Sequence, residues 1–359
     1  MKKTQRIPAP WKTLLAVALI LAVTATVTAC GGSPANNQPA APAAAPAGED
    51  PGGPYVFKLP NISSNATNLD PLSIGVYKGF FAEENVEIVE VGDIPVPELL
   101  PALISGTVTI TALMTPDGLA AIDNGANVIG IFAWATTTKE QPHMNFLTLK
   151  DSPIQSARDL VGQTIGTGGT NGCTLGIPLE YLRQGGVDAD DVEVITISPE
   201  LSMPDALRQG SIAVAGTHFT PDIVATQFPD LRVLFSDYDV LGDTGTDLTY
   251  FADKTWLEDP HNQEAVRRFI AAFTKTAKWI NANREEAREI YLTEINPNAN
   301  AELLSIRHFS EDGIIYEDHT LPWIEILNGG KNIQPLQRQD WTFAEVATNA
   351  YNPNFTGKQ

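Results

Sequence analysis

The chain of 359 residues is poor in the side chains on which many catalytic and structural sites depend. It contains only two cysteines and five histidines. The histidines show none of the spacings typical of metal sites, such as H-E-x-x-H. A phosphate-binding Walker loop, a G-x-S-x-G elbow and a dinucleotide fingerprint are also missing from the sequence. The sequence therefore predicts no cofactor, no metal site and no catalytic residue.

Positive charge is scarce as well. The chain has 23 Lys and Arg against 43 Asp and Glu, a net charge of -20. Nucleic-acid binding needs a cationic surface, so a nucleic-acid partner is excluded. Between residues 55 and 134 the only cations are Lys58 and Lys78. A strongly anionic protein repels an anionic solute at long range, so a neutral or weakly basic ring fits this composition at least as well as an anion that relies on local donors.

Long apolar runs are missing except near the N-terminus. Lys2, Lys3, Arg6 and Lys12 precede an apolar run over residues 14–23. This order is that of a secretory signal, and the run is too short for a membrane span. Removing a leader over 1–29 removes these four cations and no acid, which brings the mature chain to a net charge near -24.

The end of this leader carries one of the two cysteines. Residues 27–30 read Val-Thr-Ala-Cys and are followed by two glycines. The pattern resembles a bacterial lipobox, which implies that Cys30 is lipidated and becomes the mature N-terminus; the alternative is an ordinary signal peptide with a chance cysteine. Residues 30–54 are rich in Ala and Pro and too poor in bulky apolar residues to fold, so they predict a disordered tether. Cys173 then has no disulfide partner, which favours a small buried residue over a nucleophile.

Strand and helix patterns alternate through the body of the chain, from about residue 55 to 355. Repeated β-α-β units predict an α/β fold with mostly parallel, doubly wound sheets. From residue 262 onward the pattern becomes helical, with helices expected over 262–283, 284–292, 301–306, 321–327 and 343–350. A helix is also expected over 179–184, beginning near Pro178 because proline suits the first helical turn.

Several ordered motifs resemble the nitrate/sulfonate/taurine-type solute-binding proteins of ABC importers, whose relatives bind thiamine-precursor pyrimidines. The most specific is 154–166 (IQSARDLVGQTIG), similar to the family's I-x-S-x-x-D-L-K-G-K-x-I-G. Residues 79–88, 99–109, 185–192 and 206–212 match further family motifs in the expected order. The resemblance implies a two-lobed fold like that of type II periplasmic binding proteins, with a ligand cleft between the lobes and a helical C-terminal extension. We expect one lobe over 55–135 plus 247–359 and the other over 136–246.

Parallel α/β sheets bind ligands outside the carboxyl ends of their strands, and the resemblance points to the same loops. The loop of Gly169, Thr170 and Asn171 is the best single site, because glycines let backbone N–H groups approach a ligand ahead of a helix. A plain strand-to-helix turn is the alternative for this loop. The other predicted ligand-binding residues follow strand ends in both lobes: Asn61, Ser63, Ser64, Met114, Thr115, Trp134, His218, Phe219 and Thr220.

The resemblance implies a monomeric, extracytoplasmic lipoprotein that captures a small molecule and delivers it to an ABC permease and its ATPase. Its contact with the membrane would be the lipid on Cys30. Two alternatives stay open. One is an enzyme on the same fold, such as a pyrimidine-synthase or menaquinone-pathway relative; the other is a sensory lipoprotein that works without an importer.

Overall fold

The computed structural model describes residues 52–169, 172–242, 248–329 and 335–357. The predicted signal peptide, Cys30 and nearly all of the predicted tether lie outside these ranges, and so do Thr170 and Asn171. Residues Gly48–Gln359 form one compact unit. In the described part of the chain, no helix combines the length and the apolar character needed to cross a membrane.

The first strands form two small sheets. β1 (Tyr55–Leu59) pairs in parallel with β2 (Val86–Glu90). A three-stranded sheet has the order β3-β10-β4, in which β10 (Leu248–Asp253) runs antiparallel to both β3 (Thr111–Met114) and β4 (Val128–Ala135).

The remaining strands form one five-stranded sheet in the order β7-β6-β8-β5-β9. Its strands are β5 (Asn145–Leu149), β6 (Thr164–Thr167), β7 (Glu193–Thr196), β8 (Val214–Thr217) and β9 (Leu231–Ser236). β6 pairs in parallel with β7 and β8, whereas β5 runs antiparallel to β8 and β9. The prediction of mostly parallel sheets is therefore wrong in part, because β5 and β10 each run against their neighbours.

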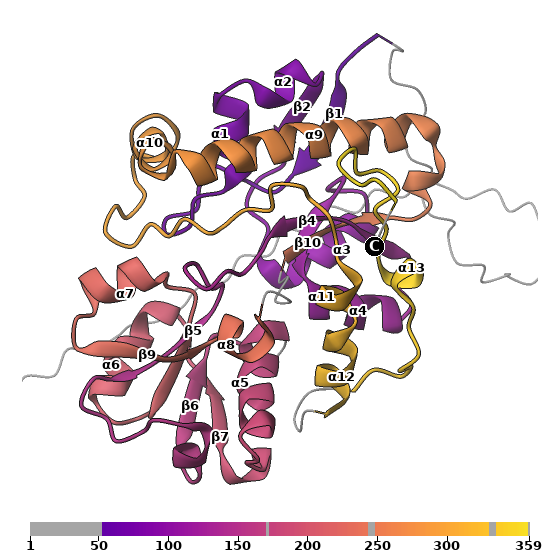
Figure 1. Ribbon diagram of the computed structural model, residues 1–359. Coiled ribbons are helices and arrows are strands. Elements are labelled where there is room, and N and C mark those ends of the chain that lie inside the picture. Colours follow the sequence, from indigo (N-terminus) through magenta and orange to yellow (C-terminus); the bar gives the residue numbers. More distant parts are fainter. Residues whose placement is uncertain (1–51, 170–171, 243–247, 330–334, 358–359) are drawn as a thin grey trace, which may run out of the picture. The chain divides into compact units, whose positions relative to one another are not determined.

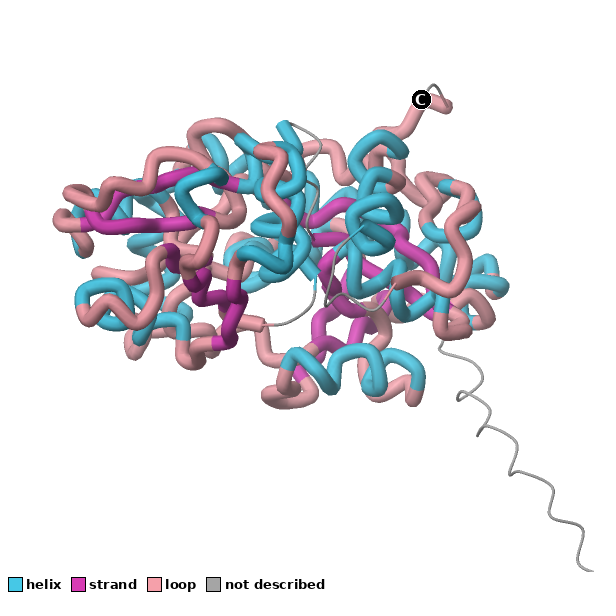
Figure 2. Tube along the Cα trace, turned by 90° about the horizontal axis from the view of Figure 1, so that it is seen from below, coloured by secondary structure: helices cyan, strands magenta, loops and turns pink. Residues whose placement is uncertain are grey.

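Helices alternate with these strands (Figures 1 and 2). The helices up to β9 are α1 (Pro71–Tyr77), α2 (Phe80–Glu83), α3 (Leu99–Ile104), α4 (Thr115–Asp123), α5 (Gly172–Gln184), α6 (Met203–Arg208) and α7 (Pro221–Gln227). Those that follow are α8 (Asp237–Leu241), α9 (Pro260–Ala282), α10 (Arg284–Ile290), α11 (Glu317–Thr320), α12 (Pro322–Gly329) and α13 (Phe343–Val346).

The long helix α9 confirms the periodic pattern that predicted it. Its apolar stripe packs on α1, α2 and the strands beneath them, as its place across β1 and β2 in Figure 1 suggests. Phe269 lies at the centre of this packing, with ring centroids 4.6 Å from Phe57, 5.2 Å from Phe81 and 5.8 Å from Phe132. Burial of these large rings provides much of the driving force for folding this part of the chain.

Two helix predictions differ from the structure. The helix predicted near Pro178 begins six residues earlier, at Gly172, and keeps Pro178 in its interior. The helix predicted over 301–306 is absent: Ser305 there forms a β-bridge with Asn68, and its N–H donates to the carbonyl of Thr67 at 2.8 Å. A tertiary backbone pairing has overridden the local helical preference.

Candidate functional site

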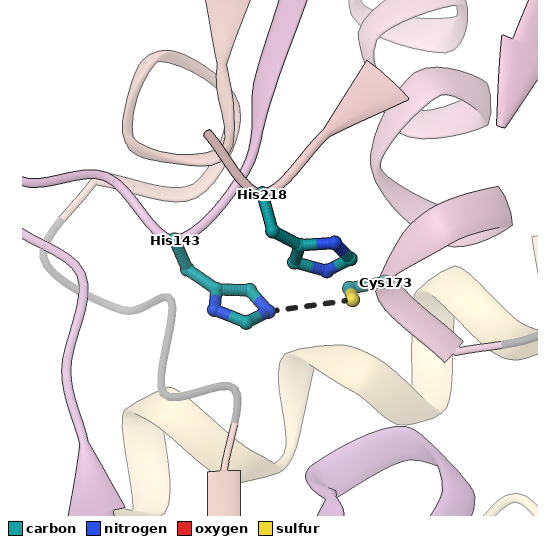
Figure 3. A group of neighbouring side chains, drawn as sticks. All are labelled: His143, Cys173 and His218. Carbon is teal, nitrogen blue, oxygen red and sulfur yellow. Dashed lines mark hydrogen bonds between the residues drawn. The ribbon is translucent and has the colours of Figure 1, made fainter. Parts of the chain in front are cut away.

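Three side chains from distant parts of the sequence meet where several strands end. His143 lies two residues before β5, His218 follows β8 directly, and Cys173 is the second residue of α5. Because Asn145 pairs with Thr217 in the antiparallel ladder, the two histidines come to the same edge of the sheet. Their ring centroids are 4.9 Å apart and edge-on. Figure 3 shows both rings turned toward the thiol of Cys173, which lies 3.7 Å from Nε2 of His143.

The second ring nitrogen of His143 contacts Arg307. The Nη1 atom of Arg307 lies 2.6 Å from Nδ1 of His143. A guanidinium can only donate, so Nδ1 accepts and the neutral ring carries its proton on Nε2, directed at Cys173. Burial, followed by the charges of Arg307 and His218, holds the pKa of His143 well below its usual value. The ring is therefore neutral at pH 7 and is a hydrogen-bond donor to the sulfur rather than a base.

Arg307 is brought to the site by backbone pairing with the end of β4. Ala135 and Phe309 form an antiparallel bridge, and the N–H of Ser310 donates to the carbonyl of Trp134 at 3.1 Å. The guanidinium of Arg307 lies 6.0 Å from the ring centroid of Trp134. A cation, an indole and two imidazoles thus share one neighbourhood.

His218 is held by Glu200, the first residue of the 3-10 turn Glu200–Ser202. One carboxylate oxygen accepts from the backbone N–H of His218 at 2.6 Å, and the other lies 2.9 Å from Nδ1. Burial alone would raise the pKa of Glu200, but the contacts with His218 outweigh it and the pKa is lowered. The ionised carboxylate fixes the proton of His218 on Nδ1, which leaves Nε2 turned toward Cys173.

Met114, at the end of β3, also contacts Cys173, with its Sδ atom 3.2 Å from Sγ. This approach depends on Gly172, which has a left-handed φ of 54°. A Cβ atom there would be 3.0 Å from Sδ of Met114 and 3.2 Å from a carboxylate oxygen of Asp117. Glycine therefore lets the start of α5 lie against β3 and α4.

Some predicted site residues lie around this cluster. Trp134 is partly buried, and its indole Nε1 has no hydrogen-bond partner among the described residues. Thr220, the N-cap of α7, is buried, and its Oγ1 is likewise unsatisfied within the described part of the chain. A buried donor or acceptor without a partner is costly, so these two atoms are candidates for contact with a ligand. Phe219 instead packs on Phe228, and the Thr115 hydroxyl lies 3.1 Å from that of Thr249.

The predicted residues after β1 form a local hydrogen-bonded group. Ser63 donates to Asn61 and lies 3.3 Å from a carboxylate oxygen of Glu90, while Ser64 donates to Asp93. In the glycine loop, the carbonyl of Gly169 accepts from Thr167 at 2.8 Å. Thr170 and Asn171 lie outside the described residues, so their role stays a prediction.

Four residues of the cluster were not predicted as site residues: His143, Cys173, Glu200 and Arg307. The signal for Cys173 is its place just after the glycine loop, and for His143 its place just before a strand. Arg307 lies 164 residues from its partner His143, just after the segment predicted to be helical, so no local pattern could have indicated it.

Comparisons with known proteins agree with this architecture. The family model described as NMT1/THI5 like matches residues 66–287. No curated protein sequence matches the chain.

Solved structures give the fold. The aliphatic sulphonate binding protein SsuA of Escherichia coli is 19% identical with a TM-score of 0.54, covering 65% of this chain and 77% of that protein. The alkanesulfonate-binding protein SsuA of Xanthomonas axonopodis pv. citri, bound to MOPS, is 14% identical with a TM-score of 0.59, covering 82% and 99%. The desulfurization enzyme DSZB is 14% identical with a TM-score of 0.53, covering 82% and 97%.

The chain has the fold of the periplasmic solute-binding proteins of ABC importers. It belongs to the NMT1/THI5-like family, as the ordered sequence motifs predicted. The predicted domain boundaries stay a prediction.

Proposed function

We propose that the chain is the extracytoplasmic solute-binding lipoprotein of an ABC importer, that it binds a small anion, and that it works as a monomer. Arg307 carries this proposal, because it brings a permanent positive charge to the place where β4, β5 and β8 meet. Ligand sites in α/β folds lie at such strand ends. The solved relatives that bind sulfonates share this fold.

The chemistry around Arg307 suits a sulfonate or a similar oxyanion. A guanidinium presents several N–H donors in a fixed plane and matches an oxyanion well. The indole of Trp134, whose ring centroid lies 6.0 Å from the guanidinium, has an N–H donor without a partner among the described residues. The hydroxyl of Thr220, two residues after His218, is likewise unsatisfied within the described part of the chain. These local donors would compensate for the long-range repulsion by a chain of net charge -20.

A planar pyrimidine-type ligand is the second candidate, and Trp134 is the observation that favours it. The indole is partly buried, and Phe309 meets it edge-on at 5.5 Å between centroids. A planar ring could stack on such a side chain.

Binding would close the protein around the ligand by hinge motion, and a permease would recognise the closed state.

An enzyme on the same fold is the alternative from a different class, and the thiol of Cys173 favours it. An activated cysteine needs a neighbouring base. His143 does not provide one, because Arg307 occupies Nδ1 and the proton therefore lies on Nε2. His218 does offer one, because Glu200 holds its proton on Nδ1 and leaves Nε2 turned toward the thiol. Cys173 is also fully buried. This burial supports a binding protein, whereas the pairing of Cys173 with His218 is the observation that supports the enzyme.

Calorimetric titration of the full chain with alkanesulfonates, taurine, nitrate and pyrimidines tests the proposal. Arg307→Gln should weaken binding of the anion about tenfold or more, because a hydrogen bond to a charged group contributes about 1.5–3 kcal/mol. Arg208→Gln is the matched control, since Arg208 pairs with Asp205 and Asp230 on α6 and beyond. An equal loss in both variants, or no loss in either, would contradict the assigned role of Arg307.

A further inference from the structure

The side chains of His143, Cys173 and His218 form a set of metal-ligand donors. One ligand atom from each residue lies within 4.8 Å of the other two. In a tetrahedral site with metal–ligand bonds of about 2.0–2.3 Å, ligand atoms lie roughly 3.3–3.8 Å apart. The 3.7 Å between Sγ of Cys173 and Nε2 of His143 already has this spacing. Figure 3 shows the two imidazole rings facing the thiol from one side.

Met114 adds a fourth donor from a different sheet. Its thioether sulfur lies 3.2 Å from Sγ of Cys173, so one ion could contact both sulfurs. Two imidazoles, a thiolate and a thioether make a soft donor set. Thioether and thiolate ligands favour copper over the harder divalent ions, and two histidines, one cysteine and a weakly bound methionine are the ligands of many copper proteins.

Glu200 holds His218 in the way that a carboxylate commonly holds a histidine that binds a metal. Metal-bound histidines donate their second ring N–H to a carboxylate or carbonyl, which fixes the ring and leaves the other nitrogen for the metal. Glu200 accepts from Nδ1 of His218 at 2.9 Å and from its backbone N–H at 2.6 Å. The ring is thus oriented with Nε2 toward the other donors before any ion arrives.

We propose that His143, Cys173 and His218 bind one copper(I) ion, with Met114 as a weak fourth ligand. Binding would displace the thiol proton of Cys173 to solvent, since the thiolate is the ligand. The Nε2 proton of His143 would also be lost from that nitrogen, and Nδ1 would be protonated in its place. No electron is transferred in this step.

Arg307 disfavours copper binding but favours anion binding, so one variant of Arg307 tests the two proposals separately. Its guanidinium donates to Nδ1 of His143, which must become a donor when Nε2 binds metal. Arg307 has to turn away for the copper to bind, and its positive charge also repels the ion. Arg307→Gln should therefore tighten copper binding, whereas the same variant should weaken binding of an anion.

Copper(I) competition with a chromophoric chelator under reducing conditions tests the site. The untagged full chain carrying Cys30→Ser has Cys173 as its only thiol, because the sequence contains two cysteines. It should bind one copper ion per chain. Cys173→Ser and His218→Ala should each weaken binding at least 100-fold, and Glu200→Gln about 10- to 100-fold, as is usual for the supporting groups of a metal site.

His261→Ala is the matched histidine control and should leave the copper affinity unchanged, because His261 lies on α9 and packs against Tyr55. Thermal unfolding without copper checks that each variant folds. Unchanged copper affinity in folded Cys173→Ser would overturn the proposal, and so would weaker copper binding in Arg307→Gln. Tighter binding of zinc than of copper(I) would overturn the choice of copper. None of these copper results bears on the anion titration, so the copper proposal can fail while the proposed function stands.

Discussion

Asp70 performs two opposed roles at the start of α1. Its carboxylate caps the helix by accepting from the N–H of Leu72 at 2.9 Å, and such a cap typically contributes about 1 kcal/mol. Burial of the carboxyl group nevertheless raises its pKa to about 7, although the bond from Leu72 opposes the shift, and the charge of Glu90 raises the pKa further. The folded protein thus holds a proton on Asp70 that the unfolded chain, with a pKa near 3.8, releases earlier.

Between about pH 4 and pH 7 the folded state binds more protons at this position than the unfolded state, so Asp70 makes the free energy of unfolding fall as the pH rises. Asp70→Asn keeps a good capping side chain and removes the charge. It should match the parent near pH 4 and be more stable by about 1 kcal/mol or more at pH 8, since one pKa unit corresponds to about 1.4 kcal/mol. Urea unfolding at the two pH values measures this; a difference that does not change with pH would refute it.

Single residues of the candidate site could be predicted only where they follow a strand. Met114 and His218 were found by that rule, and the structure brings both next to Cys173. His143 and Arg307 were not found by that rule. His143 comes before a strand, and Arg307 is placed by backbone pairing between the end of β4 and residues 308–310. Contacts made across such sequence distances leave no periodic pattern in the chain.

At the scale of elements, close packing decides where glycine is required. Gly118 lies inside α4, and a Cβ atom there would be only 2.0 Å from Cζ of Phe251 on β10. Helical propensity favours alanine over glycine by about 1 kcal/mol. The overlap with the buried ring should outweigh this gain, because overpacking typically costs about 1–3 kcal/mol.

Gly118→Ala should therefore destabilise the protein, as measured by the midpoint of chemical unfolding. Gly329→Ala, at the end of α12, is the matched control, because no atom of the described residues lies within 4 Å of the position of its Cβ atom. Its stability should stay within about 0.5 kcal/mol of the parent. A stabilised Gly118→Ala variant would show that α4 can move away from β10.

The long helix α9 and the short helices α10 and α12 were predicted well, but one short helix was not. α9 follows its periodic pattern over 23 residues, whereas the helix expected over 301–306 is replaced by backbone pairing with residues 67 and 68. The predicted start of α5 is wrong, because a first-turn position is the usual one for proline and Pro178 instead lies inside the helix. The packing of Gly172 and Gly176 against Met114 and Trp323 extends the helix past that proline.

At the scale of the whole molecule, the order of motifs was sufficient to predict the family and the α/β fold. Strand direction was not predictable in the same way. β5 and β10 each follow a passage of chain that joins two sheets, and their antiparallel pairing depends on where that passage returns. The residues of a strand do not indicate the direction of the strand with which it pairs.

The proposed lipid anchor is tested by measuring how the whole chain divides between the membrane and soluble fractions of the cell. If Cys30 carries the lipid, the expressed chain should be found with membranes, and Cys30→Ser should release most of it to the soluble fraction. Cys173→Ser should stay with the membranes, since Cys173 is buried in the folded body. Equal fractionation of Cys30→Ser and its parent would contradict the anchor.

The most direct test of the central claim is a thermal-shift titration of the full chain with alkanesulfonates, taurine, nitrate, pyrimidines and aromatic acids. A ligand that binds only the folded state stabilises it by about 2.7 kcal/mol at a hundredfold excess over its dissociation constant. We predict a saturable rise in the unfolding midpoint with a small oxyanion, and a much smaller rise in Arg307→Gln. No rise with any anion of the panel would contradict the account of this chain as an anion-binding receptor.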